Sequence, residues 1–159
     1  MASAAGGAVA STLLGNTTAF RLHVNMSNHA SDHDDIYRTV TLHSNGSFTD
    51  YNERLWDLSS TWTTEGVDRI VYGGTYTLNL PNIELHYTKI VSKCNDVYQG
   101  KEFDEVEQLD EPRITSGTLS PGGTSLAVKP FRGGEPGGAA ELQTLAVGKL
   151  HDVHGGKYC

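Results

Sequence analysis

The chain lacks the features that mark several large classes of protein. Its two cysteines, Cys94 and Cys159, do not make a disulfide framework, and neither lies in a C-x-x-C metal motif. No apolar run approaches the roughly 18 residues that span a bilayer. Lys and Arg total 12 against 19 Asp and Glu, a formal net charge of −7. Because no basic block is present, we expect neither nucleic acid nor an anionic membrane surface as a partner.

Motifs of phosphate and nucleophile chemistry are also missing. The sequence has no P-loop, no G-x-S-x-G elbow and no G-x-G-x-x-G after an expected strand, so we expect no cofactor. Two segments rich in His and Asp, 28–35 and 151–154, are candidates for metal ligands. The first is interpreted as a solvated loop between strands, and the second belongs to a tail with too little scaffold to hold ligand geometry. We therefore expect no metal site.

The start of the chain, "MASAAGGAVASTLLG", lacks the positive region and the continuous apolar core of a secretory signal. It is typical of a mobile tail of small residues. We expect a cytoplasmic protein with two free thiols. The alternative is a secreted protein whose signal peptide has been removed, in which Cys94 and Cys159 could form a bridge. The glycosylation pattern N-x-S/T occurs at 16–18, 25–27 and 45–47. The pattern is short, and it is common by chance in a chain rich in Ser and Thr.

Short runs of alternating apolar and polar residues fill most of the sequence. In "AFRLHVNM" (19–26), Phe20, Leu22, Val24 and Met26 alternate with polar residues. Similar runs predict strands over 37–43, 47–52, 60–66, 67–74, 75–80, 83–91, 113–120 and 124–131. Turn signals separate them, such as "SNG" and a double glycine. Strand signals thus recur every 8 to 12 residues or so, as in an all-β meander, sandwich or barrel.

Two segments are less regular. Residues 95–112 are polar and acidic, which indicates a long loop or one short helix. Residues 139–150 are ambiguous between helix and strand, and we favour a closing strand.

The strand count favours a single closed sheet. Eight to ten short strands joined by tight turns must protect their edges, and closing into a barrel removes the edges. We predict one antiparallel meander β-barrel over 16–150, between a flexible tail at 1–15 and another at 151–159. The main alternative is a two-sheet β-sandwich, although the Cys–Trp–Cys arrangement of immunoglobulin domains is absent.

One segment resembles a known family. The order "NGSFTDYN…STWTTEG…DRIVYGGTYTLNLPNIELHYT" is similar to the middle of lipocalin-like (calycin) barrels, where a Gly-punctuated strand, a Trp-bearing strand and a G-x-Y strand follow one another. The resemblance covers about residues 36–90. It implies a barrel with a central pocket for a small, largely apolar molecule. The two tryptophans lie mid-chain, whereas the lipocalin G-x-W motif lies near the first strand, so no functional residue is carried over by position.

The hairpin "GGTYTLNLPNIELHYTK" (73–89) raises the question of catalysis. Its apolar side chains share one face, and Glu84 and His86, two residues apart on one strand, share the other. If that face points into the barrel, the pair could meet Arg21, His23 and His43 from other strands. A His–Glu pair with an Arg partner suits proton transfer in a cofactor-free isomerase, cyclase or lyase. If the face points outward, it is the ordinary wet side of an antiparallel sheet.

Binding of a small molecule is the first functional hypothesis. The strand count, the meander pattern and the missing motifs favour a barrel that holds one hydrophobic or amphipathic organic ligand. Residues that could line its pocket are Trp56, Trp62, Tyr76, Tyr87 and Arg69. The same aromatic residues are also ordinary core residues. The cofactor-free enzyme is the second hypothesis, and a lectin or inhibitor acting through its loops is the third. The sequence leaves the oligomeric state open.

Overall fold

The computed structural model of the protein describes residues 16–25, 33–57, 65–96, 102–103, 107–130 and 142–149. Within these ranges all regular structure is strand, and no helix occurs. The nine strands are β1 (Thr18–Asn25), β2 (His33–Leu42), β3 (Ser47–Asp57), β4 (Glu65–Asn79), β5 (Asn82–Asp96), β6 (Glu102–Phe103), β7 (Glu107–Leu119), β8 (Ser125–Val128) and β9 (Gln143–Val147).

Eight of these strands close into an antiparallel barrel. Their order around the barrel is β1-β2-β3-β4-β5-β7-β8-β9, and β9 pairs with β1 to complete it. The two-residue strand β6 pairs only with the end of β5. Apart from β6, consecutive strands are neighbours, which confirms the predicted meander barrel, and the ambiguous segment at 139–150 does supply the closing strand, β9.

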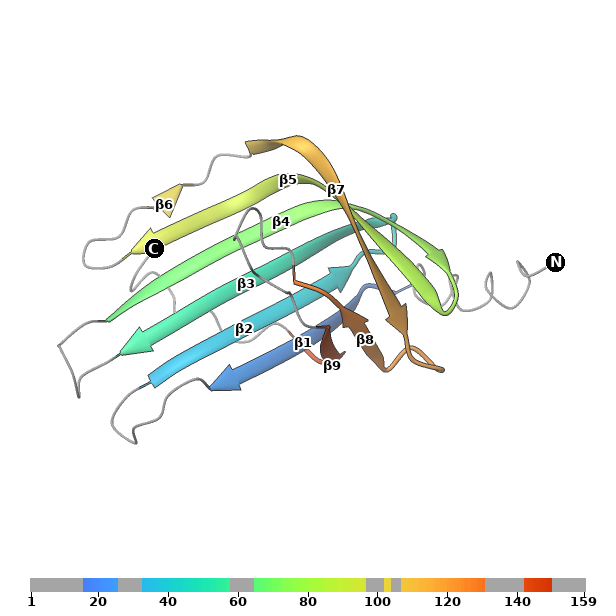
Figure 1. Cartoon of the computed structure of the whole chain (residues 1–159), viewed down its shortest axis with the longest axis horizontal. Helices are drawn as coiled ribbons and strands as arrows, with labels where there is room; N and C mark the ends of the chain where they lie inside the picture. Colours follow the sequence, from blue (N-terminus) through green and yellow to red (C-terminus); the bar gives the residue numbers. More distant parts are fainter. Residues whose placement is uncertain are drawn as a thin grey trace.

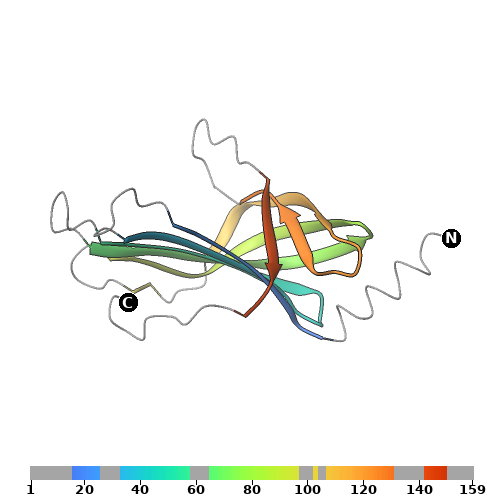
Figure 2. The same ribbon diagram turned by 90° about the horizontal axis from the view of Figure 1, so that it is seen from below.

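The barrel has two halves of different construction. In Figure 1, the long strands β1 to β5 lie side by side across the molecule, and β7, β8 and β9 lie toward one end. There they bridge β5 to β1, and we call this part the closed half. Figure 2 shows the long strands continuing beyond it as a curved sheet, which we call the open half. The boundary lies near Arg21, the last β1 residue that pairs with β9.

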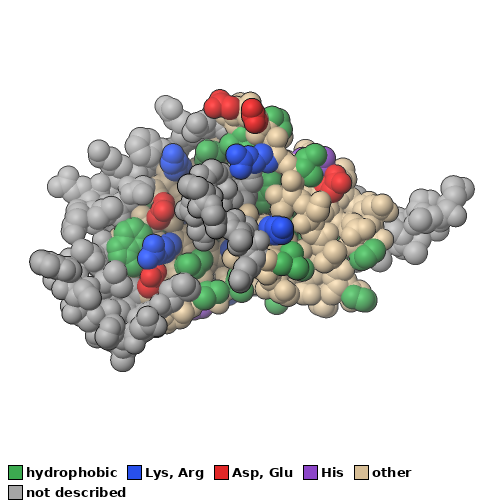
Figure 3. Space-filling model, in the orientation of Figure 1, with side chains coloured by type: hydrophobic (Ala, Val, Ile, Leu, Met, Phe, Trp, Pro, Cys, Tyr) green, Lys and Arg blue, Asp and Glu red, His purple; other side chains and the backbone are tan. Residues whose placement is uncertain are grey.

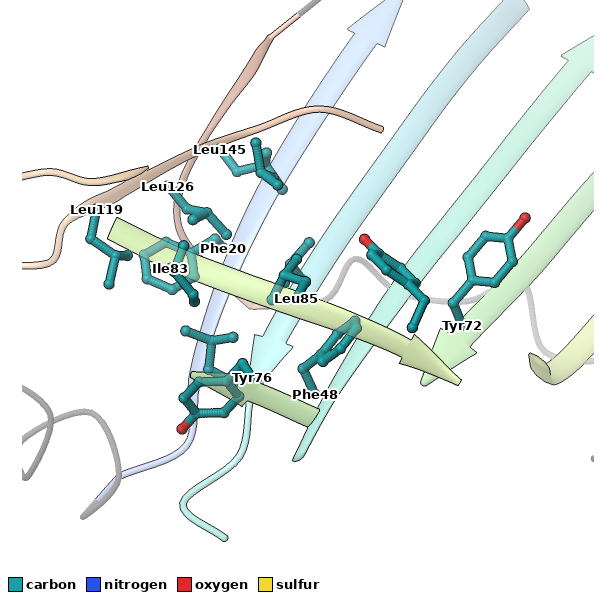
Figure 4. Packing of buried hydrophobic residues seen from close by; sticks show 13 residues of the cluster. Phe20, Phe48, Tyr72, Tyr76, Ile83, Leu85, Leu119, Leu126 and Leu145 are labelled. Carbon is teal, nitrogen blue, oxygen red and sulfur yellow. The ribbon is translucent and has the colours of Figure 1, made fainter. Parts of the chain in front are cut away.

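Apolar side chains fill the closed half. Alternation along β5 places Ile83, Leu85 and Tyr87 inside, each 0% exposed, as the hairpin pattern predicts. They pack against side chains from all the other barrel strands (Figure 4). The core comprises Phe20, Val40, Leu42, Phe48, Tyr72, Tyr76, Ile83, Leu85, Tyr87, Leu119, Leu126, Val128 and Leu145. This end of the barrel is therefore a packed interior rather than a channel.

The double glycine does not end a strand, contrary to the sequence interpretation. The two strands expected over 67–74 and 75–80 are one strand, β4, whose pairing with β5 shifts register near Gly73 and Gly74. A Cβ atom at Gly74 would collide with the carbonyl oxygen of His86 on β5. Glycine is therefore needed so that the two backbones can approach closely at the irregularity.

The acidic segment at 95–112 is also more ordered than its composition indicated. Strand β5 continues to Asp96, and β7 begins at Glu107, where Glu107 and Gln108 pair with Ile90 and Lys89. Cross-strand pairing thus overrides weak local strand propensity, which is the usual reason for such errors. Residues 97–101 and 104–106 lie outside the described part of the chain.

Cys94 is not a free thiol. It is 0% exposed and disulfide-bonded, so the expectation of two free thiols is wrong. The other cysteine of the sequence, Cys159, lies outside the described residues, as do the predicted tails at 1–15 and 151–159. In the described ranges, no helix has the length and apolar character that a membrane span requires.

Candidate functional site

A salt bridge is buried inside the barrel, where the closed half meets the open half. Arg38 on β2 and Asp50 on β3 point inward, because they alternate in phase with the core residues Val40 and Phe48. Arg38 donates from Nε to Oδ1 of Asp50 at 3.0 Å and from Nη2 to Oδ2 at 2.8 Å. Their side chains are 2% and 0% exposed. This two-pronged geometry is the strongest form of an Arg–carboxylate contact.

Two neighbouring side chains complete the hydrogen bonding of Asp50. The hydroxyl group of Tyr87 on β5 donates to Oδ2 at 2.6 Å, and Nδ2 of Asn52 donates to Oδ1 at 3.1 Å. Burial, reinforced by the charge of Asp50, raises the pKa of Tyr87, so this phenol stays protonated and remains a donor.

Arg38 also reaches the short strands that close the barrel. Its Nη1 donates to Oε1 of Gln143 on β9 at 3.0 Å. Weaker contacts run to the carbonyl oxygens of Val128 and Lys129, at 3.4 and 3.2 Å. One guanidinium thus connects β2 with β3, β8 and β9 across the interior. We call Arg38, Asp50, Asn52, Tyr87 and Gln143 the interior polar cluster.

A pocket opens beside this cluster, between β4, β5 and β7. Its volume is about 490 Å³. The residues that line it are Ile70, Tyr72, Ile90, Leu109, Asp110, Glu111 and Arg113. Ile70, Ile90 and Leu109 pack against the core, and the charged residues from β7 are exposed. Basic and acidic side chains are interspersed on the face seen in Figure 3. The pocket lining therefore combines apolar side chains with charged ones.

Tyr72 joins the pocket to the polar cluster. Its ring lines the pocket and lies edge-on to the ring of Tyr87, with centroids 5.8 Å apart and an interplanar angle of 83°. Burial, followed by the negative charges of Asp50 and Asp68, raises the pKa of Tyr72 to about 12. A molecule in the pocket would thus contact a neutral phenol, which packs against Tyr87, a hydrogen-bond partner of Asp50.

A second ion pair lies farther out on the inner face. Arg54 donates to both carboxylate oxygens of Asp34, each at 2.9 Å, and its guanidinium carbon lies 5.5 Å from the ring centroid of Trp56. Arg54 is 52% exposed, so this pair is much better solvated than Arg38 and Asp50.

Glu84 and His86 lie on the outer face of the barrel. They alternate with Ile83, Leu85 and Tyr87, which point inward. Nε2 of His86 is 3.3 Å from Oε2 of Glu84, a close contact without the geometry of a hydrogen bond. Their side chains are 51% (Glu84) and 31% (His86) exposed. Of the two orientations that the sequence left open, the structure has the outward one.

The other residues of the proposed catalytic set do not approach this pair. Arg21 and His23 lie on the outer face of β1, where His23 stacks on Tyr37 at 4.4 Å and contacts Asp35 at 2.8 Å. Strands β1 and β5 are four steps apart in either direction around the eight-stranded barrel, so their outer faces point away from each other. His43 lies in the turn after β2, where its backbone pairs with Ser47. The five side chains are therefore dispersed.

The proposed ligand-binding residues are distributed over several environments. Tyr87 belongs to the interior polar cluster, and Trp56 lies on the inner face of the open half. Tyr76 is in the core at the closed end, where its hydroxyl donates to the carbonyl of His43. Arg69 lies on the outer face, 3.8 Å from Glu53. Trp62 is outside the described residues.

Sequence reasoning missed the residues at the centre of the site. Arg38 and Asp50 were not singled out, and Tyr72 was only one of several aromatic residues. The signal was present: Arg38 has the same parity as Val40 and Leu42, so it belongs to the apolar face of its strand. A charged residue in phase with an apolar face indicates a buried pair.

No group of three or more His, Cys, Asp or Glu residues in the described ranges is arranged to hold a metal ion. Of the segment 28–35, which the sequence indicated as a loop, residues 33–35 begin strand β2, and residues 28–32 lie outside those ranges, as does 151–154. No protein-family model, no curated protein and no solved structure matches the chain.

Proposed function

We propose that the protein binds one small hydrophobic or amphipathic organic molecule in the pocket between β4, β5 and β7. The observation that carries the proposal is a 490 Å³ space whose lining combines the apolar side chains of Ile70, Ile90 and Leu109 with exposed charged residues of β7. Small-molecule sites have this size and this combination of apolar walls with a few polar groups. The lipocalin-like resemblance also implies a pocket that holds a small, largely apolar molecule, and we propose that this pocket serves that purpose.

The interior polar cluster supports this role by fixing the inner wall of the pocket. Tyr72 packs against Tyr87, whose hydroxyl is bonded to Asp50. The donors of Arg38 are taken up by Asp50 and its other partners, so the pocket offers a ligand the aromatic face of Tyr72 rather than an unpaired buried charge. A wall that does not rearrange lowers the entropic cost of binding.

Binding is favoured over the cofactor-free enzyme because the expected acid–base pair faces away from the pocket. A general base must lie within hydrogen-bond reach of the proton that it takes. Glu84 and His86 lie on the outer face of β5, and Arg21 and His23 lie on the opposite side of the barrel.

The disulfide at Cys94 indicates the kind of compartment in which the protein is found. Disulfides form and persist in oxidising environments and are rare in the cytosol. We therefore propose the secreted alternative in place of a cytoplasmic protein, on the strength of the buried, bonded Cys94.

Fluorescence titration with the neutral probe N-phenyl-1-naphthylamine tests the binding proposal. Wild-type protein should bind it saturably, and Ile90→Arg should weaken binding by at least about tenfold, because it places a charge in the apolar wall. Ile114→Arg is the matched control, since Ile114 is 61% exposed on the outer face of β7. It should bind as wild type does. No saturable binding by the wild type, or equal binding by all three proteins, would contradict the proposal.

A further inference from the structure

The turn between β2 and β3 carries a modification motif that ligand binding does not explain. Asn45, Gly46 and Ser47 form the N-x-S pattern, and Asn45 is exposed. Gly46 has a φ of +87°, and a Cβ atom placed there would meet no atom within 4 Å. Asn45 is thus exposed in a turn where the described residues leave space around Gly46.

The side chain of Asn45 is held in a defined orientation. Its Oδ1 accepts hydrogen bonds from the backbone N–H of Ser47 at 3.0 Å and from the hydroxyl group of Ser47 at 2.6 Å. The hydroxyl group that the motif requires thus contacts the very carboxamide that would be modified. With the oxygen turned toward Ser47, the Nδ2 group of the amide is directed away from it.

Tyr76 anchors the turn to the barrel. Its backbone N–H donates to the carbonyl of Gly46 at 3.0 Å, and its hydroxyl group donates to the carbonyl of His43 at 2.8 Å. The turn lies at the closed end, whereas the pocket residues Tyr72 and Ile90 lie farther along β4 and β5. A large group on Asn45 would leave the core and the pocket in place.

A second, independent observation concerns the compartment. The motif alone is weak, because it also occurs in proteins that never meet the glycosylation machinery. Cys94, however, is buried and disulfide-bonded, and disulfides belong to the oxidising compartments in which N-glycosylation takes place.

We propose that Asn45 is a site of N-linked glycosylation. The donor class is an oligosaccharide linked to a polyisoprenyl diphosphate, used by a transferase of the secretory pathway. Nδ2 of Asn45 forms a bond to C1 of the first sugar, and the bond from C1 to the diphosphate oxygen breaks. The lipid diphosphate leaves, Nδ2 loses one proton, and nothing is oxidised or reduced. The bulky, hydrated glycan covers the closed end of the barrel.

Peptide mapping of the full-length protein isolated from the organism that makes it tests the proposal. Trypsin releases residues 39–54, between Arg38 and Arg54, and this peptide contains both Asn45 and Asn52. Asn52 lies outside any N-x-S/T pattern and is an internal control. Treatment with a peptide N-glycosidase should convert Asn45 to Asp and leave Asn52 unchanged. A peptide whose mass already equals that of the plain sequence before treatment would overturn the proposal, as would glycan found only at another asparagine.

Two variants secreted from a eukaryotic host give a second measurement. Ser47→Ala should remove the glycan at Asn45, whereas Ser47→Thr, which keeps the hydroxyl group, should retain it. Retention of that glycan by Ser47→Ala would overturn the proposal. Since the turn is remote from Ile90, probe binding should be the same with and without the glycan, so the two proposals fail independently.

Discussion

Two ion pairs on opposite faces of the barrel wall, Arg38–Asp50 and Glu84–His86, differ in character. Inside, Arg38 and Asp50 are 2% and 0% exposed, and Tyr87 and Gln143 add hydrogen bonds to them. Outside, the Glu84 side chain is 51% exposed and contacts His86 without hydrogen-bond geometry. Both pairs join oppositely charged residue types across a short distance. Of these two pairs, only Arg38–Asp50 has both side chains almost fully withdrawn from water, so there each charge depends on its partner.

The largest expected effect is the loss of one inner partner. Arg38→Met leaves the Asp50 carboxylate buried without a counter-charge, and breaking such a pair costs about 3–5 kcal/mol in the free energy of unfolding. Arg54→Met is the comparison variant: the Arg54 side chain is 52% exposed and that of Asp34 is 13% exposed, so water reaches this pair and the loss of Arg54 should cost clearly less than the loss of Arg38. Urea unfolding of both variants measures the difference.

Replacing both Arg38 and Asp50 tests whether the unpaired charge causes the loss of stability. The double variant Arg38→Met/Asp50→Leu should recover part of the stability that Arg38→Met loses, because no unpaired charge remains. Equal destabilisation by Arg38→Met and Arg54→Met would contradict the contrast between the buried and the solvated pair.

An intermediate effect is expected at high pH. Burial and the nearby carboxylates raise the pKa of Tyr72 from 10.0 to about 12, so folding favours the neutral phenol. Its contribution to stability is full below pH 10 and is lost as the pH rises to about 12. A two-unit shift corresponds to roughly 2–3 kcal/mol.

Unfolding of wild type and Tyr72→Phe at a series of pH values between 9 and 12, in about half-unit steps, isolates this contribution, because every other tyrosine is common to both proteins. The free energy of unfolding of Tyr72→Phe should increase relative to that of the wild type as the pH rises through this range. A difference in unfolding free energy that does not change with pH would show that folding does not raise the pKa of Tyr72.

The smallest effect is expected on the outer face. Glu84→Gln and His86→Ala should each change the free energy of unfolding by less than about 1 kcal/mol, as exposed pairs do. Neither should alter the binding of N-phenyl-1-naphthylamine, because both side chains point away from the pocket. If either substitution weakened binding as much as Ile90→Arg does, the prediction would be wrong and Glu84 and His86 would belong to the functional site.

The architecture followed from the sequence because alternation is a local property. Runs such as "AFRLHVNM" and "IELHYTK" have a period of two, which only a strand with one buried face satisfies. The number of such runs then favours a closed sheet, and the structure has one. Errors arose where pairing overrides local preference, as at Gly73 and Gly74 and in the acidic segment that begins β7.

The pocket and the polar cluster could not be located in this way. Arg38 is 12 residues from Asp50 in the chain, 49 from Tyr87 and 105 from Gln143. Their meeting depends on the register of four strands and on the closure of β9 against β1. The parity of Arg38 marks it as inward, but parity does not say which residues stand opposite across the barrel.

The order of residues is enough to establish that Glu84 and His86 share one face of a strand, that Ile83, Leu85 and Tyr87 share the other, and that the strands form a meander. These statements need only the pleat of a strand and the positions of turns. Which face lies inside depends on how the strands pack in three dimensions. Burial of the apolar side chains closes the barrel around them, and the same closure turns the Glu84–His86 face to water and draws the Arg38–Asp50 pair into the interior beside the pocket.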